Sequence, residues 1–310
     1  MAKVLVTGGA GFIGSHIVDA LLLDGHTVQV IDNLSSGEKR NLPDTVPLHV
    51  VDICSRDAKG VVKAFAPDVL VHAAAQISVR ASMDDPGFDA QVNVAGFVSL
   101  LSELRTIPGA RCVFLSTGGA IYGEQDTFPA TEDHAVNPES VYGLSKRIGE
   151  QYLAFWERVW GVKSTTLRLA NVYGPRQNPH GEAGVVAIFC KGLLQGSPLV
   201  INGSGDQTRD FVYVGDVARA VAESVRGTHS GIFNIGTGIE TSVNTLVANL
   251  KRAAATEGAV SYGPGKDGEQ QRSCIDPRRA FSVFGWAPKV QFQEGICLTM
   301  DWFKSQIAKG

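Results

Sequence analysis

Residues 4–14 read Val-Leu-Val-Thr-Gly-Gly-Ala-Gly-Phe-Ile-Gly, a short apolar run that passes directly into a glycine-rich turn. An apolar run of this length, bounded by glycines, is typical of a strand that is buried on both faces of a parallel sheet. Apolar residues then recur at helical spacing over 12–23, and Gly25 follows where a helix C-cap is expected. The stretch therefore predicts a strand, a tight turn and a helix at the start of the chain.

The same alternation continues through the first half of the chain. Further strands are expected at 27–31, 48–51, 69–71, 112–115 and 163–169, and helices at 57–65, 88–105 and 142–160. Strands that alternate with helices predict a parallel sheet covered on both faces, with ligands bound beyond the carboxyl ends of its strands. The sequence thus predicts an α/β fold with a Rossmann-type doubly wound parallel sheet over 1–171, to which 212–238 return.

After Asn171 the pattern becomes less regular. A loop rich in Pro, Gly and Asn spans 173–184, and a helix at 185–194, a short strand at 199–201 and a helix at 241–252 follow. We expect the remainder of 172–310 to form a smaller mixed α/β C-terminal substrate domain.

Composition excludes several classes of function. The 310 residues are 44% hydrophobic and 19% charged, with a net charge of −3 and no basic run of five residues, which disfavours nucleic acid and membrane surfaces as partners. The five cysteines are scattered and lack a C-x-x-C pair, so we expect a reducing compartment, no disulfide framework and no metal site. The first strand leaves no room for a signal peptide, and no apolar run reaches membrane-spanning length, which favours a soluble cytoplasmic enzyme or binding protein.

The glycine turn predicts a dinucleotide site. From Gly9 it satisfies G-x-G-x-x-G between a strand and a helix, where backbone and helix N-terminus can approach a pyrophosphate. Asp32 closes the second strand 18 residues after Gly14, at the place for a carboxylate that binds ribose hydroxyls. That carboxylate would repel a 2′-phosphate and so favours NAD over NADP. Arg40 lies close in sequence and keeps NADP as an alternative cofactor. Asp52 and Ile53, which close the third strand, suit a contact with the amine and ring of the adenine.

Tyr142 and Lys146 form a second pattern. Four residues are about one helical turn, so the two side chains share one helix face. A nearby positive charge favours the phenolate, and we therefore expect Lys146 to lower the pKa of Tyr142 and make it a usable general base.

Six motifs, in order and over nearly the whole length, resemble the extended short-chain dehydrogenase/reductase family, and most of all its UDP-glucose 4-epimerase group. They are Thr7–Gly14, His72-Ala-Ala-Ala75, Ser116-Thr-Gly-Gly-Ala-Ile-Tyr-Gly123, Tyr142-Gly-Leu-Ser-Lys146, Arg168-Leu-Ala-Asn-Val-Tyr-Gly-Pro175 and Arg209-Asp-Phe-Val-Tyr-Val-Gly-Asp216.

The resemblance implies an NAD-dependent epimerase acting on a UDP-sugar. Tyr142 would take the proton of the sugar 4′-hydroxyl while hydride passes from C4′ to a tightly held NAD⁺, and Lys146 would hold the nicotinamide ribose. The 4-keto sugar would then turn over and receive the hydride on its opposite face. By the same analogy, helices 88–105 and 142–160 would pair with a second copy in a homodimer, although internal packing of those helices is equally consistent with the sequence.

The resemblance also assigns binding residues. To the cofactor it assigns Gly8, Gly11, Phe12, Ile13, Gly14, Asp32, Asn33, Ser36, Gly37, Asp52, Ile53, Ala73, Ala74, Ala75, Tyr142 and Lys146. To the substrate it assigns Gly118, Gly119, Asn171, Val185, Val186, Phe189, Leu199, Ile201, Arg209, Lys266, Glu269 and Ser273. Asn171, Phe189 and Leu199 could equally be structural, and Arg209 could instead pair with Asp210 or Asp216.

The chain departs from the family pattern at Gly118. The family usually carries Ser or Thr at this position, and its hydroxyl bonds the reacting oxygen. We hypothesise that Thr117 or a water takes this role, the alternative being that Thr117 only ties down the loop. The same Gly118-Gly119 pair argues against 4,6-dehydratases, which carry Asp-Glu here, and the place of Glu124 argues against UDP-glucuronate decarboxylases.

Ser273 stands where a bulky tyrosine excludes 2′-N-acetyl groups in the family. A small residue predicts activity on UDP-GlcNAc and UDP-GalNAc as well as on UDP-glucose and UDP-galactose. The alternatives are a UDP-glucuronate 4-epimerase, which would need an added cation near C6′ for which Arg80 is the candidate, a UDP-glucuronate decarboxylase, and a non-catalytic NAD-binding sensor or scaffold.

Overall fold

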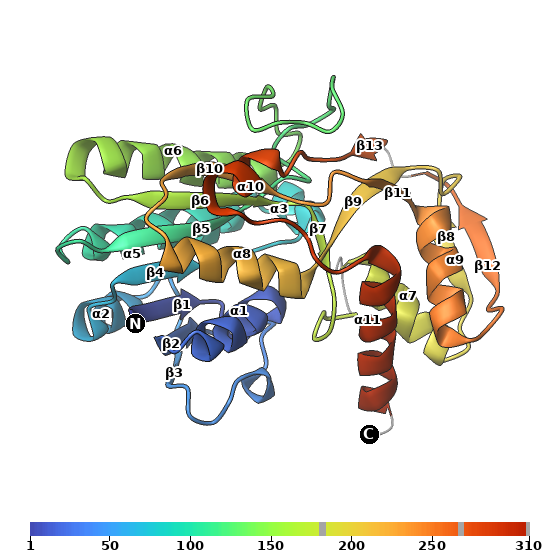
Figure 1. The fold of residues 1–310 in the computed structure, drawn as a ribbon, viewed down its shortest axis with the longest axis horizontal. Coiled ribbons are helices and arrows are strands. Elements are labelled where there is room, and N and C mark those ends of the chain that lie inside the picture. The colour runs from blue at the N-terminus through green and yellow to red at the C-terminus, as the bar shows by residue number, and fades with distance from the viewer. Residues whose placement is uncertain (180–183, 266–269, 308–310) are drawn as a thin grey trace.

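The computed structural model describes residues 1–179, 184–265 and 270–307, and its centre is a seven-stranded parallel sheet (Figure 1). The strand order is β10-β6-β5-β4-β1-β2-β3. In chain order the strands are β1 (Lys3–Thr7), β2 (Thr27–Asp32), β3 (Leu48–Val50), β4 (Val69–His72), β5 (Arg111–Thr117), β6 (Ser164–Leu169) and β10 (Gly231–Ile235). The predicted Rossmann-type α/β fold is confirmed. β3 ends before Val51, earlier than expected, because the Val51 amide bonds back to the His49 carbonyl.

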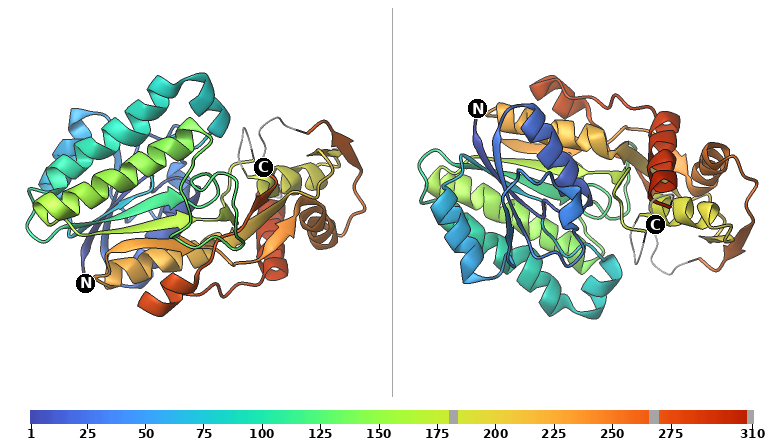
Figure 2. Two further views of the ribbon diagram at one scale, coloured as in Figure 1. Left: turned by 90° about the horizontal axis from the view of Figure 1, so that it is seen from above. Right: turned by 90° about the horizontal axis from the view of Figure 1, so that it is seen from below.

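Successive side chains of each strand point to opposite faces of the sheet, so the apolar core is divided into two clusters, one on each face. Val4 and Val6 face a cluster shared with α1 (Phe12–Leu23) and α8 (Val214–Arg226), whereas Leu5 faces the opposite cluster. Helices α2 (Arg56–Phe65), α5 (Phe97–Leu104) and α6 (Val141–Trp160) cover that second face, so that the sheet is the middle of three layers (Figure 2).

The helix expected at 88–105 is divided. The short helix α3 (Val79–Asp84) precedes α4 (Pro86–Ala90), whose N-terminus is capped by Asp85 at 2.9 Å from the Phe88 amide. A π-helical segment, η2 (Gln91–Gly96), then joins α4 to α5. Such segments widen a helix by one residue per turn and often occur at functional sites.

A smaller part of the molecule is built beyond the carboxyl ends of the sheet (Figure 1). One sheet joins β7 (Asn171–Tyr173), β9 (Thr208–Tyr213), β11 (Glu240–Ser242) and β13 (Arg272–Ser273), and β8 (Leu199–Asn202) pairs in parallel with β12 (Val260–Gly263). A third apolar cluster fills the space between these strands and the helices α7 (Val185–Leu194), α9 (Val243–Ala254) and α11 (Phe292–Ile307). The remaining short helices are η1 (Lys39–Asn41) and α10 (Arg278–Phe284).

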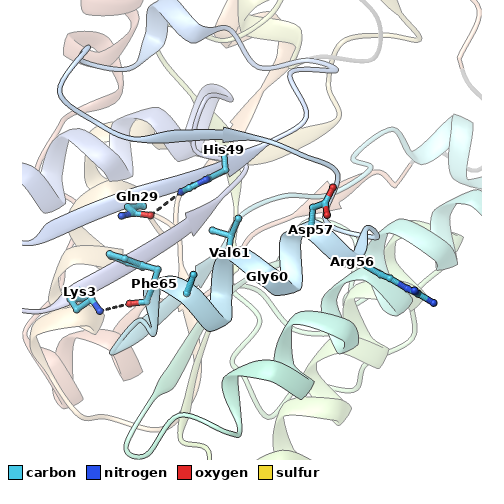
Figure 3. A pocket seen from close by; sticks show the side chains of 9 residues that line it. Lys3, Gln29, His49, Arg56, Asp57, Gly60, Val61 and Phe65 are labelled. Carbon is cyan, nitrogen blue, oxygen red and sulfur yellow. Dashed lines mark hydrogen bonds between the residues drawn. The ribbon is translucent and has the colours of Figure 1, made fainter.

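A hollow of about 500 Å³ lies beside α2 at the β3 edge of the large sheet (Figure 3). Within it His49 lies 2.8 Å from the Gln29 side-chain oxygen, and Lys3 bonds to the Phe65 carbonyl at the far end of α2. None of the residues assigned above to the cofactor or substrate lines this hollow, so it is separate from the candidate site.

Across the described residues, no helix has the length and apolarity needed to cross a membrane. The same part of the chain holds no group of three His, Cys, Asp or Glu side chains arranged to bind a metal ion.

Candidate active site

The glycine turn leaves no room for a side chain at position 8 or position 14. Gly8 has φ +68°, and a Cβ on it would lie 2.7 Å from the Ala74 amide nitrogen. A Cβ on Gly14 would lie 2.0 Å from the Gly8 carbonyl oxygen. Helix α1 begins at Phe12 after Gly11, which provides no side-chain cap. The turn therefore presents bare backbone and a helix N-terminus, the arrangement that accepts a pyrophosphate.

Asp32 fixes the second part of this cradle. Its two carboxylate oxygens accept the amides of Ala10 and Leu34 at 2.9 and 2.8 Å. A Cβ on Gly37 would lie 3.0 Å from an Asp32 oxygen, so the loop after β2 returns to the glycine turn. A carboxylate retains further acceptor capacity beyond these two bonds, which ribose hydroxyls could use. Arg40 is paired with Glu38 at the surface.

The ends of β3 and β4 complete the cradle. Asn33 donates to Asp52 at 2.9 Å, and the Cys54 amide, also bonded to Asp52, lowers the pKa of that carboxyl group. The amides of Ala73 and Ala74 bond to the main chain and side chain of Thr7 at 3.2 and 3.3 Å. Apart from Tyr142 and Lys146, the residues assigned to the cofactor thus lie near the adjacent carboxyl ends of β4, β1, β2 and β3; of these, Ser36 is exposed and Ile53 is buried.

Helix α6 carries the candidate acid–base pair. Ser140 caps the helix by accepting the Gly143 amide, and the Tyr142 amide donates to the Ser82 hydroxyl at 3.1 Å. Lys146 is 4% exposed; its Nζ donates to the Leu115 carbonyl at 2.9 Å and lies 5.9 Å from the Tyr142 ring centroid. The two side chains therefore share one face of α6, at the end of β5.

A buried ion pair holds α6 against the sheet. Arg168 on β6 donates through Nε and Nη2 to the two carboxylate oxygens of Glu150 at 2.9 and 2.7 Å, and both side chains are 1% exposed. Ser116 donates to the same carboxylate, and Tyr122 bonds to Arg168 and Asn234. Three motif residues, Ser116, Tyr122 and Arg168, thus anchor the catalytic helix.

The expected lowering of the Tyr142 pKa by Lys146 is wrong for the chain itself. Burial raises the pKa of Tyr142 to about 12, the negative charge of Asp89 adds to the rise, and a hydrogen bond with Thr117 opposes it. Burial also lowers the pKa of Lys146 to about 8, against the opposing effects of Asp89 and Glu150. Near neutral pH, Tyr142 is therefore an acid in this structure, and a further positive charge is needed to make it a base.

The neighbouring motif histidine has no acid–base role here. His72 is 1% exposed, bonds to the Thr7 hydroxyl at 2.9 Å and stacks on Phe97. Burial holds its pKa well below the usual value, with a smaller contribution from Lys146, so His72 stays neutral.

The structure gives a physical reason for the departure at Gly118. A Cβ there would lie 2.6 Å from Cδ1 of Ile275 and 3.2 Å from the Leu169 carbonyl oxygen. The preceding residue, Thr117, accepts the Ala120 amide at 3.1 Å and is hydrogen-bonded to Tyr142. The hydroxyl beside the tyrosine thus belongs to Thr117, and Ile275 fills the space beside Gly118. Sequence reasoning missed Ile275, which no motif marks.

Three residues assigned to the substrate meet on the smaller sheet. Arg209 on β9 is the register partner of Ser273 on β13, and β7, which begins at Asn171, pairs with the other end of β9. A Cβ on Gly119 would lie 3.4 Å from the Asn171 side-chain oxygen. These residues therefore border the loop that carries Thr117.

The alternative pairing of Arg209 with Asp210 or Asp216 stays a prediction, and both carboxylates have other partners as well. Asp210 accepts the amides of Thr237 and Gly238, and Asp216 pairs with Arg219.

The apolar residues assigned to the substrate have a packing role. Val185 is partly buried, and four others are fully buried in the third cluster: Val186, Phe189, Leu199 and Ile201. Their contact with a uracil ring stays a prediction. Lys266 and Glu269 lie outside the described residues.

The chain is similar to known proteins and solved structures over nearly its whole length. Residues 4–236 match the model of the NAD-dependent epimerase/dehydratase family. The chain is 43% identical to a UDP-glucose 4-epimerase of Mycolicibacterium smegmatis, over 98% of this chain and 99% of that protein. It is 30% identical to UDP-glucuronic acid decarboxylase 1 of Xenopus tropicalis, over 98% of this chain and 73% of that protein.

Two solved structures are similar throughout. The UDP-glucose 4-epimerase of Thermotoga maritima with UDP-glucose has a TM-score of 0.96 and 42% identity, covering 98% of this chain and 99% of that one. The UDP-glucose 4-epimerase of Thermus thermophilus in complex with NAD has a TM-score of 0.93 and 43% identity, covering 97% and 99%.

Proposed function

Because the chain belongs to the NAD-dependent epimerase/dehydratase family, as its motifs predicted, we propose that it is an isomerase that interconverts UDP-glucose and UDP-galactose. The observation that carries the proposal is the placement of Tyr142 and Lys146 on one face of α6 at the end of β5, beside the glycine cradle, with Lys146 Nζ 5.9 Å from the tyrosine ring centroid. The 43% identity to a UDP-glucose 4-epimerase supports it, and the lower identity to a UDP-glucuronic acid decarboxylase disfavours that alternative.

The cradle fits NAD. Cβ atoms would fill the turn at Gly8 and Gly14, and Asp32 presents a carboxylate where ribose hydroxyls would bind. When bound, NAD⁺ supplies a hydride acceptor that gives the same hydride back, together with a positive charge that favours the Tyr142 phenolate.

The proton of the sugar 4′-hydroxyl is transferred by side chains of the protein itself. Tyr142 takes the proton of the sugar 4′-hydroxyl and returns it after the 4-keto sugar has turned over. Thr117 holds the tyrosine oxygen by a hydrogen bond and so limits the positions that the oxygen can take. Lys146, buried and bonded to the Leu115 carbonyl, contributes a fixed positive charge while it is protonated. Asn171 and Arg209 would hold the pyrophosphate of the substrate and leave the sugar free to turn.

The test is a measurement of cofactor and turnover on one preparation. The purified protein is denatured, released NAD is quantified, and the native protein is assayed with UDP-galactose, UDP-glucose and UDP-glucuronate. We expect NAD near one equivalent and interconversion of the first two sugars, and Tyr142→Phe should retain the NAD and lose the turnover. NAD without turnover in the wild type would instead identify a sensor or scaffold. Preferred turnover of UDP-glucuronate would favour the hexuronate alternative, although its candidate cation, Arg80, is 82% exposed and faces Asp84.

We also propose that the enzyme accepts UDP-GlcNAc and UDP-GalNAc. The small size of Ser273, which is buried and lies opposite Arg209 in the pairing of β13 with β9, is what supports this proposal.

A cytoplasmic homodimer completes the proposal. Exposed apolar side chains follow one face of α6, with Leu144, Phe155 and Val159 respectively 48, 39 and 49% exposed. A second copy that brings the same face would bury this stripe in an isologous interface of α5 and α6. Light scattering should give twice the mass of 32.9 kDa, and Phe155→Glu should give the single mass.

A further inference from the structure

Asp89 on α4 is a fully buried carboxylate that no sequence motif marks. Ser145 Oγ donates to its Oδ1 at 2.6 Å, and the side-chain amides of Gln76 and Asn93 donate to its Oδ2 at 2.9 and 3.0 Å. Both carboxylate oxygens accept and neither donates, which is the arrangement of an ionised carboxylate. A buried carboxylate is costly unless it is hydrogen-bonded, and these three bonds offset the burial of Asp89.

The partners of Asp89 belong to the active site. Ser145 lies on α6 between Tyr142 and Lys146, within the turn that sets the spacing of the pair. Gln76 follows the loop assigned to the cofactor, and it exchanges two hydrogen bonds of 2.9 Å with Asn93 on the π-helical segment. Asp89 therefore connects the catalytic helix to the loop that borders the cofactor cradle.

On the premise of the proposed epimerase function, we propose that Asp89 is a positioning residue that fixes α6 through Ser145 and sets the charge around Tyr142 and Lys146.

Its charge acts on both members of the pair in the same direction. The negative charge of Asp89 raises the pKa of Tyr142 and that of Lys146. A more basic phenolate removes a proton from a sugar hydroxyl more readily, and Lys146 stays positive to a higher pH. The buried carboxylate thus makes the Tyr142 phenolate a stronger base once it has formed, shifts its formation to higher pH, and extends the pH range in which Lys146 is charged.

The other charged groups around the pair are already paired or neutral. Glu150 on α6 also raises the Lys146 pKa, but it is held by Arg168 and Arg147. His72 on β4 stays neutral. On α3, Arg80 and Asp84 face one another at the surface, where water screens them. Asp89 is therefore the charge whose removal tests the idea.

The experiment compares the pH profile of kcat/KM for the wild type and Asp89→Asn, each with its bound NAD. The substitution removes the charge at nearly constant shape, so both limbs of the profile should move to lower pH by roughly one unit. The maximal rate should fall severalfold and by no more than about tenfold, because a phenolate whose pKa is lower by one unit is a base weaker by at most that factor. Asp84→Asn removes a similar charge at a 74% exposed position and should leave the profile in place.

A second variant separates the tether from the charge. Ser145→Ala keeps the carboxylate and removes its bond to α6, so kcat should fall severalfold while both limbs stay in place.

The outcomes are distinct from those that test the function itself. A wild type that does not interconvert UDP-sugars would overturn the epimerase proposal. If the wild type is active and Asp89→Asn lowers the whole profile without moving its limbs, Asp89 is only structural and the inference is wrong.

Discussion

Ile275 occupies the space in which a side chain at position 118 would stand, with its Cδ1 only 2.6 Å from the place of a Cβ on Gly118. Ile275 is 1% exposed, and its amide bonds to Asp210 at 3.4 Å. The residue that follows β13 therefore determines which residue type fits in the loop after β5.

The first prediction concerns this steric pair. Gly118→Ser should lower the free energy of unfolding by about 2 kcal/mol through overpacking, and Ile275→Ala by about 3 kcal/mol through the cavity that it leaves. In the double variant the serine enters that cavity, so the combined loss should be at least about 1 kcal/mol smaller than the sum. Urea unfolding of the four proteins measures this coupling, and strict additivity would show that the two residues do not compete for space.

The second prediction concerns the hydroxyl beside the tyrosine. Thr117→Ala should lower kcat by well over tenfold, because it removes the hydrogen bond to Tyr142. That bond lowers the Tyr142 pKa, so its loss should also move the acidic limb of the rate profile to higher pH. Thr117→Ser keeps a hydroxyl and serves as the control. An unchanged rate in Thr117→Ala would leave a water, or Tyr142 alone, in this role.

The third prediction concerns the charge of Lys146. Because burial lowers its pKa to about 8, the positive charge is present below that pH and is lost as the pH rises through it. Activity should therefore decline above about pH 8. Arg stays charged throughout this range, so Lys146→Arg should lack the decline even where its rate is lower. A decline of the same shape in both proteins would assign it to another group.

The fourth prediction concerns substrate size. Ser273→Tyr should lower kcat/KM for UDP-GalNAc by at least about tenfold more than for UDP-galactose, because the added ring would take the place of the acetyl group. Ser273→Ala should leave kcat/KM unchanged for both sugars. Equal losses for the two sugars in the tyrosine variant would refute a role of Ser273 in selection.

The fifth prediction concerns the cofactor turn. Gly14→Ala places a methyl group 2.0 Å from the Gly8 carbonyl oxygen, so the purified protein should release little NAD when denatured. Gly60→Ala on α2 meets no atom within 4 Å and should raise stability by roughly 0.5–1 kcal/mol with its NAD retained. Full NAD content in the Gly14 variant would argue against the turn as the pyrophosphate site.

Local patterns predicted much of the fold. The helices at 12–23 and 185–194 have the expected bounds, because apolar spacing and flanking glycines define both ends. Helix α8 was not predicted; it begins at Val214 directly after β9, and Gly215, which by itself indicates a turn, lies within its first turn. The helices α10 and α11 near the C-terminus were not predicted either.

Long-range contacts limited the prediction of the site. The motifs pointed to the cradle, the tyrosine and the lysine, because the cradle glycines directly follow a strand and the tyrosine and lysine lie within one turn of one helix. The bond between Asp89 and Ser145 joins residues 56 apart, and the contact of Gly118 with Ile275 spans more than half of the chain. The pKa of Tyr142 was predicted in the wrong direction because spacing reports the neighbouring charge but not the burial.

The position of β10 has a consequence for synthesis on the ribosome. β6 is buried along its whole length, and its outer neighbour is β10, which the chain reaches only at residue 231. A nascent chain that ends near residue 171 would therefore expose an unpaired strand edge that is buried in the folded protein, which is a site for aggregation. The nucleotide-binding half cannot finish folding first and wait for the rest, because its last strand begins only at residue 231, well inside the second half of the chain.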